Sequence, residues 1–233
     1  MLIAALSAPL APFLAEVGDR ANPLEDKSSE PSIVVIGPST AATQGWIVPR
    51  EAAGELPRPI PNFKTSNTLA QQRAWESKVG AIQAQSHSIQ LRVQGGSSKA
   101  VTLHGLTVDA DCRESQAGVH VLTLGAGGLP SHMIDVELDA PYGPRVKPLG
   151  ESGVENPNPE PATFPYFVTE SELESFVITA RAGKKMCDWT AELEWSIDER
   201  MGTTKIDDRG HAFRLTSPTS ATSRMVLDPA GPP

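Results

Sequence analysis

The segment CDWTAELEWSI, residues 187–197, alternates apolar and polar side chains without a break. Its apolar positions are Cys187, Trp189, Ala191, Leu193, Trp195 and Ile197. Successive side chains of a β-strand point to opposite faces of the sheet, so a strand with this pattern buries one face and leaves the other in water. The segment therefore predicts a strand of an antiparallel sheet, with Trp189 in the core.

Further runs with the same period of two extend from His87 to Leu215. They lie at 87–94, 101–112, 119–124, 133–139, 164–169, 176–181, 203–206 and 212–215. The turn Asp207–Gly210 separates the last two runs, which predicts a hairpin there. About seven to nine closely spaced strands with almost no helix predict an all-β fold, an antiparallel, immunoglobulin-like β-sandwich.

In the run 101–112 the apolar residues move from odd-numbered to even-numbered positions. Val101 and Leu103 share one parity, whereas Leu106, Val108 and the positions after them share the other. All of them face the core only if one extra residue is accommodated between Leu103 and Leu106. We therefore predict a β-bulge at His104–Gly105.

The segments outside this region are less regular. We divide the chain into an apolar N-terminal segment (1–20), a proline-rich arm (21–84), the sandwich (85–216) and a disordered tail (217–233). Within the arm, the short runs Ile33–Ile36 and Trp46–Val48 predict edge strands. A helix is expected at 66–81, where Leu69, Trp75 and Val79 share a face; it is the one short helix before the sandwich.

The N-terminal apolar stretch does not read as an ordinary signal peptide. Its first positive charge, Arg20, follows the apolar run, and Pro9 and Pro12 interrupt any helix within it. Three interpretations remain: the remnant of a membrane anchor, which we favour, a poor signal sequence, or an apolar helix that packs on another surface.

The overall composition excludes several classes of protein. A formal net charge of −8 argues against a nucleic-acid binder, which needs a cationic face. Hydrophobic residues make up 39% of the chain, which argues against a wholly disordered protein. No run of 18 apolar residues occurs, which argues against a polytopic membrane protein.

The two cysteines, Cys112 and Cys187, both lie at inward-facing positions of their strands. They are either two reduced, buried cysteines or one disulfide. A bridge would close a loop of 75 residues and would stabilise the fold by about 4 kcal/mol in the chain-entropy model. A metal site made from two cysteines alone is not expected, because structural zinc takes four ligands.

No motif of the chain predicts catalysis, cofactor binding or a metal site, and we expect no enzyme. The run Gly125–Pro130 begins like a phosphate-binding loop, but a strand rather than a helix follows it. Carboxylates line two strands and one turn: Asp135, Glu137, Asp139, Asp188, Glu192, Glu194, Asp207 and Asp208. Solvated sheet faces are the favoured interpretation; a calcium site and glycoside hydrolysis are the alternatives.

The histidines also lack the spacing of metal ligands along a helix or strand. They are His87, His104, His120, His132 and His211. We expect ordinary solvated or hydrogen-bonded imidazoles.

Several ordered motifs resemble an uncharacterised family from actinobacteria. They are IQLRVQGGSSKAVTLHGLTVDA (89–110), SHMIDVELDA (131–140), FPYFVTESELESFVITA (164–180), CDWTAELEWS (187–196) and TTKIDDRGHAF (203–213). The resemblance implies an N-terminal membrane anchor and a β-domain on the extracytoplasmic side of the cell membrane. It assigns no role to any residue.

These observations favour a non-catalytic binding or sensing module of the cell envelope. Its partner would be an unknown protein or envelope ligand, held by loops 111–118, 125–131 and 141–163, because variable loops on a rigid sheet commonly carry binding residues. A cytoplasmic interaction or structural protein is the first alternative. An envelope glycan hydrolase that uses the acidic strands is the second.

Overall fold

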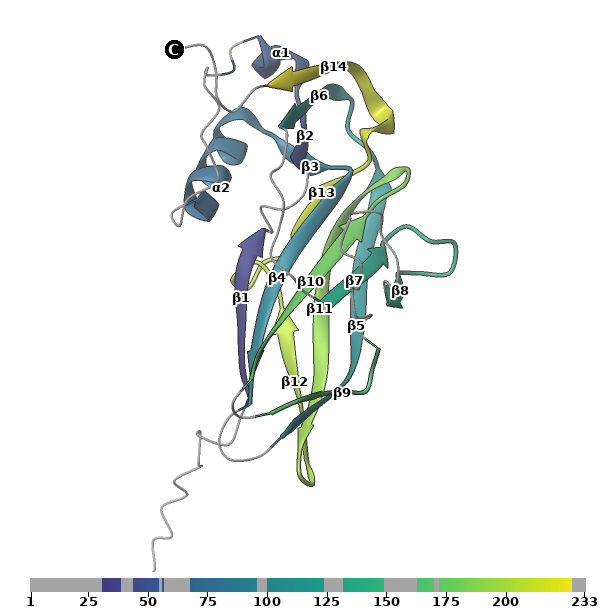
Figure 1. The fold of residues 1–233 in the computed structure, drawn as a ribbon. Coiled ribbons are helices and arrows are strands. Elements are labelled where there is room, and N and C mark those ends of the chain that lie inside the picture. The colour runs from purple at the N-terminus through teal and green to yellow at the C-terminus, as the bar shows by residue number, and fades with distance from the viewer. Residues whose placement is uncertain are drawn as a thin grey trace, which may run out of the picture.

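The computed structural model describes residues 31–38, 44–54, 56, 68–95, 100–123, 132–148, 163–169 and 172–227. Strands dominate this part of the chain (Figure 1). They are β1 (Ser32–Pro38), β2 (Gln44–Val48), β3 (Ile82–Ala84), β4 (Ser86–Gln94), β5 (Val101–Glu114), β6 (Gly118–Thr123), β7 (His132–Glu137), β8 (Arg145–Pro148), β9 (Tyr166–Val168), β10 (Leu173–Arg181), β11 (Lys185–Ile197), β12 (Arg200–Ile206), β13 (Phe213–Thr216) and β14 (Ala221–Leu227). The helices are α1 (Arg50–Ala53), α2 (Thr68–Val79) and a 3₁₀ turn at Pro218–Ser220.

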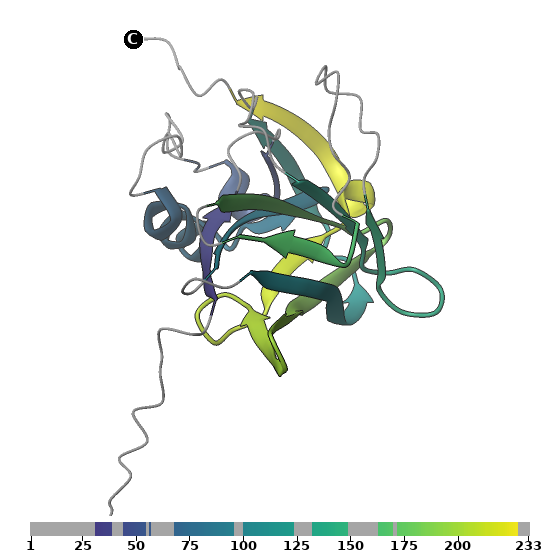
Figure 2. The ribbon, with the colours of Figure 1, turned by 60° about the horizontal axis from the view of Figure 1, so that its bottom comes forward.

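Within the described residues these strands form two sheets. One has the order β1-β4-β10-β7-β8; the other has the order β14-β6-β2-β3-β13-β11-β5-β9, with β12 also beside β11. The long strands of the two sheets enclose a common core, and Figure 2 views the two layers from below. The predicted all-β sandwich is confirmed. It is not purely antiparallel, because β7 pairs with β10, β3 with β13 and β6 with β14 in parallel.

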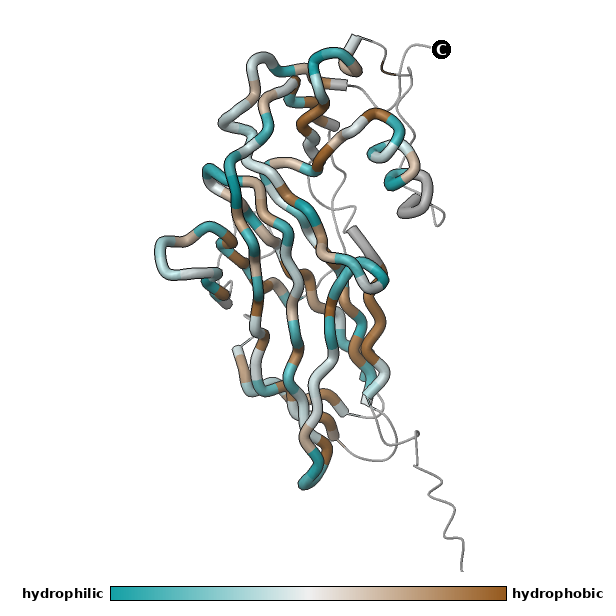
Figure 3. The backbone as a smooth tube through the Cα atoms, turned by 180° about the vertical axis from the view of Figure 1, so that it is seen from behind, coloured by the Kyte–Doolittle hydropathy of each residue, from teal (hydrophilic) through white to brown (hydrophobic). Residues whose placement is uncertain are grey.

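The core follows the alternation read from the sequence. The inward positions of β11 and of β4 are all buried, and Trp189 is only 1% exposed. Figure 3 shows the matching alternation of hydrophilic and hydrophobic residues along the long strands. Burial of a large apolar side chain stabilises a fold by about 1.5–3 kcal/mol, so this interior supplies the main driving force.

The pairing of β11 with β5 contains the predicted bulge. Glu194 lies opposite Gly105, whereas the next residue of β11, Trp195, lies opposite Leu103. His104 is thus the extra residue, and it points outward, where its Nε2 lies 2.7 Å from Ser196 Oγ. Leu103 and Leu106 both reach the core as a result.

The same pairing places the two cysteines directly opposite each other. Cys112 is the register partner of Cys187, and their sulfurs form a disulfide of 2.07 Å. The bridge ties β5 to β11 near the end of the ladder where β13 also joins.

A second, smaller core lies beside the upper part of the longer sheet. There α2 packs its Trp75 and Val79 against Trp46 and Val48 of β2. The rings of Trp46 and Trp75 meet edge to face, with centroids 5.3 Å apart. Helix α2 agrees with the helix expected at 66–81, while α1 was not expected.

Three described segments of the expected arm (21–84), namely β1, β2 and β3, are part of the two sheets. β1 is an edge strand, as predicted, and pairs with β4. β2 is not an edge strand, because it lies between β3 and β6. Its residues Trp46–Val48 are fully buried, and this continuous apolar run is typical of a strand covered on both faces.

Two predicted features near the C-terminal end are wrong. β12 and β13 do not form a hairpin, since both pair with β11, end to end along one edge. The chain reverses instead at Asp198–Glu199, between β11 and β12. The tail is not irregular from 217 onward either, because Ala221–Leu227 forms β14 alongside β6; residues 228–233 lie outside the described residues.

The loop expected at 141–163 is interrupted by a strand. Residues Arg145–Pro148 form β8, which pairs antiparallel with β7. Residues 149–162 of that loop lie outside the described residues, as does the N-terminal segment 1–20.

Deleting His104 should destabilise the protein by about 3–6 kcal/mol, because the strand would lose its extra residue and turn Val101 and Leu103 toward water. Urea-induced unfolding measures the change. The matched substitution His104→Ala removes only an exposed hydrogen bond and should cost no more than about 1 kcal/mol. A deletion variant as stable as the parent would contradict the bulge.

Candidate functional site

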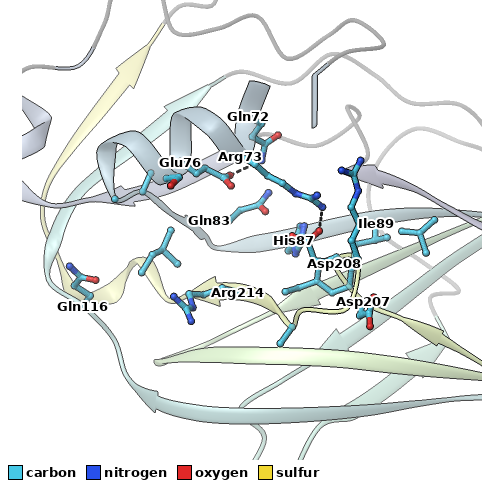
Figure 4. A pocket seen from close by; sticks show the side chains of 18 of the residues that line it. Gln72, Arg73, Glu76, Gln83, His87, Ile89, Gln116, Asp207, Asp208 and Arg214 are labelled. Carbon is cyan, nitrogen blue, oxygen red and sulfur yellow. Dashed lines mark hydrogen bonds and ion pairs between the residues drawn. The ribbon is translucent and has the colours of Figure 1, made fainter. Parts of the chain in front are cut away.

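A pocket of about 730 Å³ lies between α2, the start of β4 and the turn at 207–212. Its volume falls within the range of roughly 300–1,000 Å³ that is usual for small-molecule sites. The polar side chains that matter most for its chemistry are Gln72, Arg73, Glu76, His87, Asp207 and Asp208 (Figure 4). Apolar surface of the pocket is supplied by Ile82, Ile89 and Phe213.

One side of the pocket is a hydrogen-bonded group centred on Glu76. Gln72, one helical turn earlier in α2, donates from Nε2 to Glu76 Oε1 at 2.8 Å. Trp46 of β2 donates from Nε1 to the same oxygen, also at 2.8 Å. Burial raises the pKa of Glu76, and these two donated bonds only partly offset that effect. The group fixes α2 on the sheet and fixes the orientation of the Gln72 amide.

His87 forms the floor of the pocket. Its ring lies 5.2 Å from that of Phe213 and 5.9 Å from that of Trp189, both edge to face. Burial, together with the positive charge of Arg73, lowers the pKa of His87 to about 4. The imidazole is therefore neutral at physiological pH.

An ion pair spans the opening between the helix and the turn. Arg73 of α2 pairs with Asp208, and Figure 4 shows its guanidinium reaching across above His87. The turn is well defined: Asp207 accepts a hydrogen bond from the Gly210 backbone at 2.9 Å, and Asp208 and His211 exchange two backbone bonds. Arg209 and Gly210 have positive φ angles of 54° and 91°.

Three side chains that line this pocket carry a buried polar atom with no hydrogen-bond partner among the described residues: Gln72 Oε1, His87 Nδ1 and Asp208 Oδ1. Asp208 Oδ1 forms an ion pair with Arg73, which leaves Gln72 Oε1 and His87 Nδ1, on side chains that are 3% and 8% exposed. An unsatisfied buried polar group costs about 1–3 kcal/mol, so a molecule that bonds to both would recover that free energy. The arrangement is suited to binding a ligand.

The acidic strands do not converge on a catalytic pair. Asp135 and Glu137 lie on the outer face of the shorter sheet, where they pair with Arg181 and Lys147. Glu192 and Glu194 lie on the outer face of the other sheet, on the opposite side of the sandwich. No cluster of three or more potential metal ligands is present in the described part of the chain.

The two remaining strand aspartates have structural partners. Asp188 pairs with Arg214 and Arg113. Asp139 accepts bonds from the backbone nitrogens of Gly183, Lys184 and Lys185 at 2.7–3.1 Å. These partners outweigh burial and lower the pKa of both carboxyl groups.

The loops predicted to bind a ligand are not the ones that line the pocket, apart from Gln116 in loop 111–118. Residues 125–131, with the run Gly125–Pro130, lie outside the described residues. Sequence reasoning missed the pocket, although it left two signals. His87 takes an apolar position of its strand, and Gln72 and Glu76 lie one turn apart on the predicted helix.

No family model, curated protein or solved structure matches this chain. Among the residues described, neither helix has the length and apolar character needed to cross a bilayer.

His87 makes stability depend on pH. Its pKa is about 4 when folded and 6.5 when unfolded, so the stability is complete above pH 6.5 and declines by up to about 3 kcal/mol as pH falls toward 4. His87→Phe should remove this decline in urea midpoints measured from pH 7.5 to 4.5.

Ile89→Val, at a buried apolar position of the same strand, serves as control: it should lower the midpoint by a similar amount at every pH and keep the parent's slope. His120, whose pKa burial also lowers, and Glu76, which acts with the opposite sign, remain in all three proteins. An unchanged slope in the His87 variant would contradict the burial of a neutral imidazole.

Proposed function

We propose that this protein is a non-catalytic binding module whose ligand occupies the pocket between α2 and the turn 207–212. The observation that carries the proposal is the pair of buried, unsatisfied atoms, Gln72 Oε1 and His87 Nδ1, in one pocket of ligand size. Native structures pair nearly all buried polar groups, and further exceptions in the described residues, such as His120 Nε2, Trp189 Nε1 and Thr216 Oγ1, lie outside this pocket. Gln72 Oε1 and His87 Nδ1 differ from these because both belong to side chains that line one pocket of ligand size, which favours a bound partner.

The rigid surroundings support binding as well. Gln72 is held by Glu76, and the His87 ring lies against Trp189 and Phe213. Their positions are therefore set before a ligand arrives, which lowers the entropic cost of association.

We propose further that the module works at the cell envelope, on the extracytoplasmic side of the membrane. The disulfide between Cys112 and Cys187 supports this location, because disulfides persist in oxidising compartments. The resemblance to the actinobacterial family points the same way, as does the predicted immunoglobulin-like character of the sandwich. A cytoplasmic interaction protein is the alternative. Hydrolysis of glycans is less favoured, since Glu137 lies across the sandwich from Glu192 and Glu194.

Filling the pocket should abolish binding without unfolding the protein. Ser77 is an exposed residue of α2 that lines the pocket, and Ser77→Trp would occupy its volume. In nuclear magnetic resonance spectra titrated with a library of small-molecule fragments, some fragments should shift the signals of Gln72 and His87 in the parent. The same fragments should leave these signals unchanged in the variant.

The matched control is Lys78→Trp, at the next residue, which is exposed but does not line the pocket. It should bind the fragments as the parent does. The proposal fails if no fragment shifts pocket signals in the parent, or if Ser77→Trp binds them unchanged.

Protein purified from its native host should contain no free thiol when thiols are blocked at lysis and counted after denaturation. The reason is that an extracytoplasmic compartment would preserve the bridge between Cys112 and Cys187. Two free thiols would contradict that location and favour the cytoplasmic alternative.

A further inference from the structure

The direction of the unsatisfied Gln72 oxygen restricts the chemistry of the ligand. Glu76 Oε1 already accepts hydrogen bonds from Trp46 and from the Gln72 amide nitrogen. A carboxylate is only an acceptor, so the amide must present its nitrogen to Glu76 and its oxygen elsewhere. The oxygen left without a partner therefore requires a ligand group that donates a hydrogen bond.

His87 adds a second requirement. Because its pKa is lowered to about 4, the imidazole is neutral at physiological pH. Nδ1 then either donates or accepts one hydrogen bond, according to the tautomer. A hydroxyl group satisfies either possibility, because it can donate one hydrogen bond or accept one, and a second hydroxyl group of the same ligand can donate to Gln72.

The charges of the pocket disfavour ionic ligands. Three arginines and three carboxylates line it, so their formal charges cancel: Arg73, Arg209, Arg214, Glu76, Asp207 and Asp208. An anion that approached Arg73 would have to displace Asp208 from it and would meet the acceptor oxygen of Gln72. A cation would approach a buried imidazole that already lies in the field of Arg73.

The pocket is lined by both polar and apolar side chains. Guanidinium, carboxylate and amide groups are planar and form paired hydrogen bonds. Ile82, Ile89 and Phe213 supply apolar surface beside them. A sugar ring has the same mixture, with hydroxyl groups around its edge and C–H groups on its faces.

We infer that the pocket binds a neutral carbohydrate, a hexose or N-acetylhexosamine unit of a glycan. The inference rests on the proposed function of the pocket as a ligand site and specifies the class of that ligand. Gln72 and His87 recognise hydroxyl groups of the sugar, and the closed Arg73–Asp208 pair disfavours an acidic sugar beside them.

The test uses the full chain and two sets of probes. One set contains neutral disaccharides and trisaccharides of glucose, galactose and N-acetylglucosamine; the other contains the same oligosaccharides ending in glucuronate. Saturation-transfer magnetic resonance and calorimetric titration measure binding. At least one neutral oligosaccharide should bind, and at least about tenfold more tightly than its acidic counterpart.

Two substitutions test the assigned contacts. Gln72→Met removes the acceptor oxygen at nearly constant length, together with the hydrogen bond that the amide nitrogen donates to Glu76, and His87→Phe removes Nδ1. Each should weaken binding of the neutral sugar about five- to tenfold, as expected for one hydrogen bond to a neutral group. Ser77→Trp should abolish binding, and Lys78→Trp should leave it unchanged. Circular dichroism of each variant confirms that it is folded.

Three results would overturn the inference: acidic sugars that bind as tightly as neutral ones, neutral sugars that bind equally to Ser77→Trp, or no sugar bound at all. The fragment titration separates this failure from failure of the proposed function. If fragments without hydroxyl groups occupy the pocket and no sugar does, the pocket is a ligand site of another class. If no fragment enters it, the proposed function itself is wrong.

Discussion

The pairing of β11 with β5 is the constraint on which the rest of the structure depends. It runs from Lys185 opposite Glu114 to Ser196 opposite Thr102. It directs six side chains of β11 into the core and places the two cysteines within bonding distance. Because β12 and β13 share the other edge of β11, the turn between them is held at a fixed place, beside α2 and His87. The positions of the residues that line the pocket thus depend on the pairing of β11 with β5, the longest strand pairing among the described residues.

The parts of the fold that could be predicted from the sequence are those that depend on the spacing of apolar residues within one segment. The alternation in 187–197 and 87–94 gives both the strands and their buried faces, and the three-residue step from Leu103 to Leu106 reveals the bulge. These features depend only on neighbouring residues, which is why they can be read before any partner strand is known. The helix at α2 is predictable within two residues at each end for the same reason.

Pairing between strands that are distant in the sequence could not be predicted in this way. Nothing in the run Thr203–Leu215 tells whether the turn at Asp207–Gly210 reverses the chain or only interrupts one edge. The seven residues of β14 form a strand because they pair with β6, about a hundred positions earlier in the chain. The composition of this segment suggests disorder, and that pairing with a distant strand could not be read from it. The site was missed on similar grounds. Neither His87 nor Gln72 stands out in the sequence, and the two line one pocket only because α2 is packed across the start of β4.

The placement of β1 has a mechanical consequence. Ser32 pairs with Gln94, so the chain enters the sandwich about 24 Å along β4 from His87 and about 10 Å along β1 from Val35, which lines the pocket. Figure 1 shows β1 rising along the long axis from that lower end. A pull on the chain ahead of Ser32 would load the β1–β4 bonds in shear, all together rather than one after another, because antiparallel bonds lie across the strands. A copy held at a surface through that end would therefore resist tension along β1.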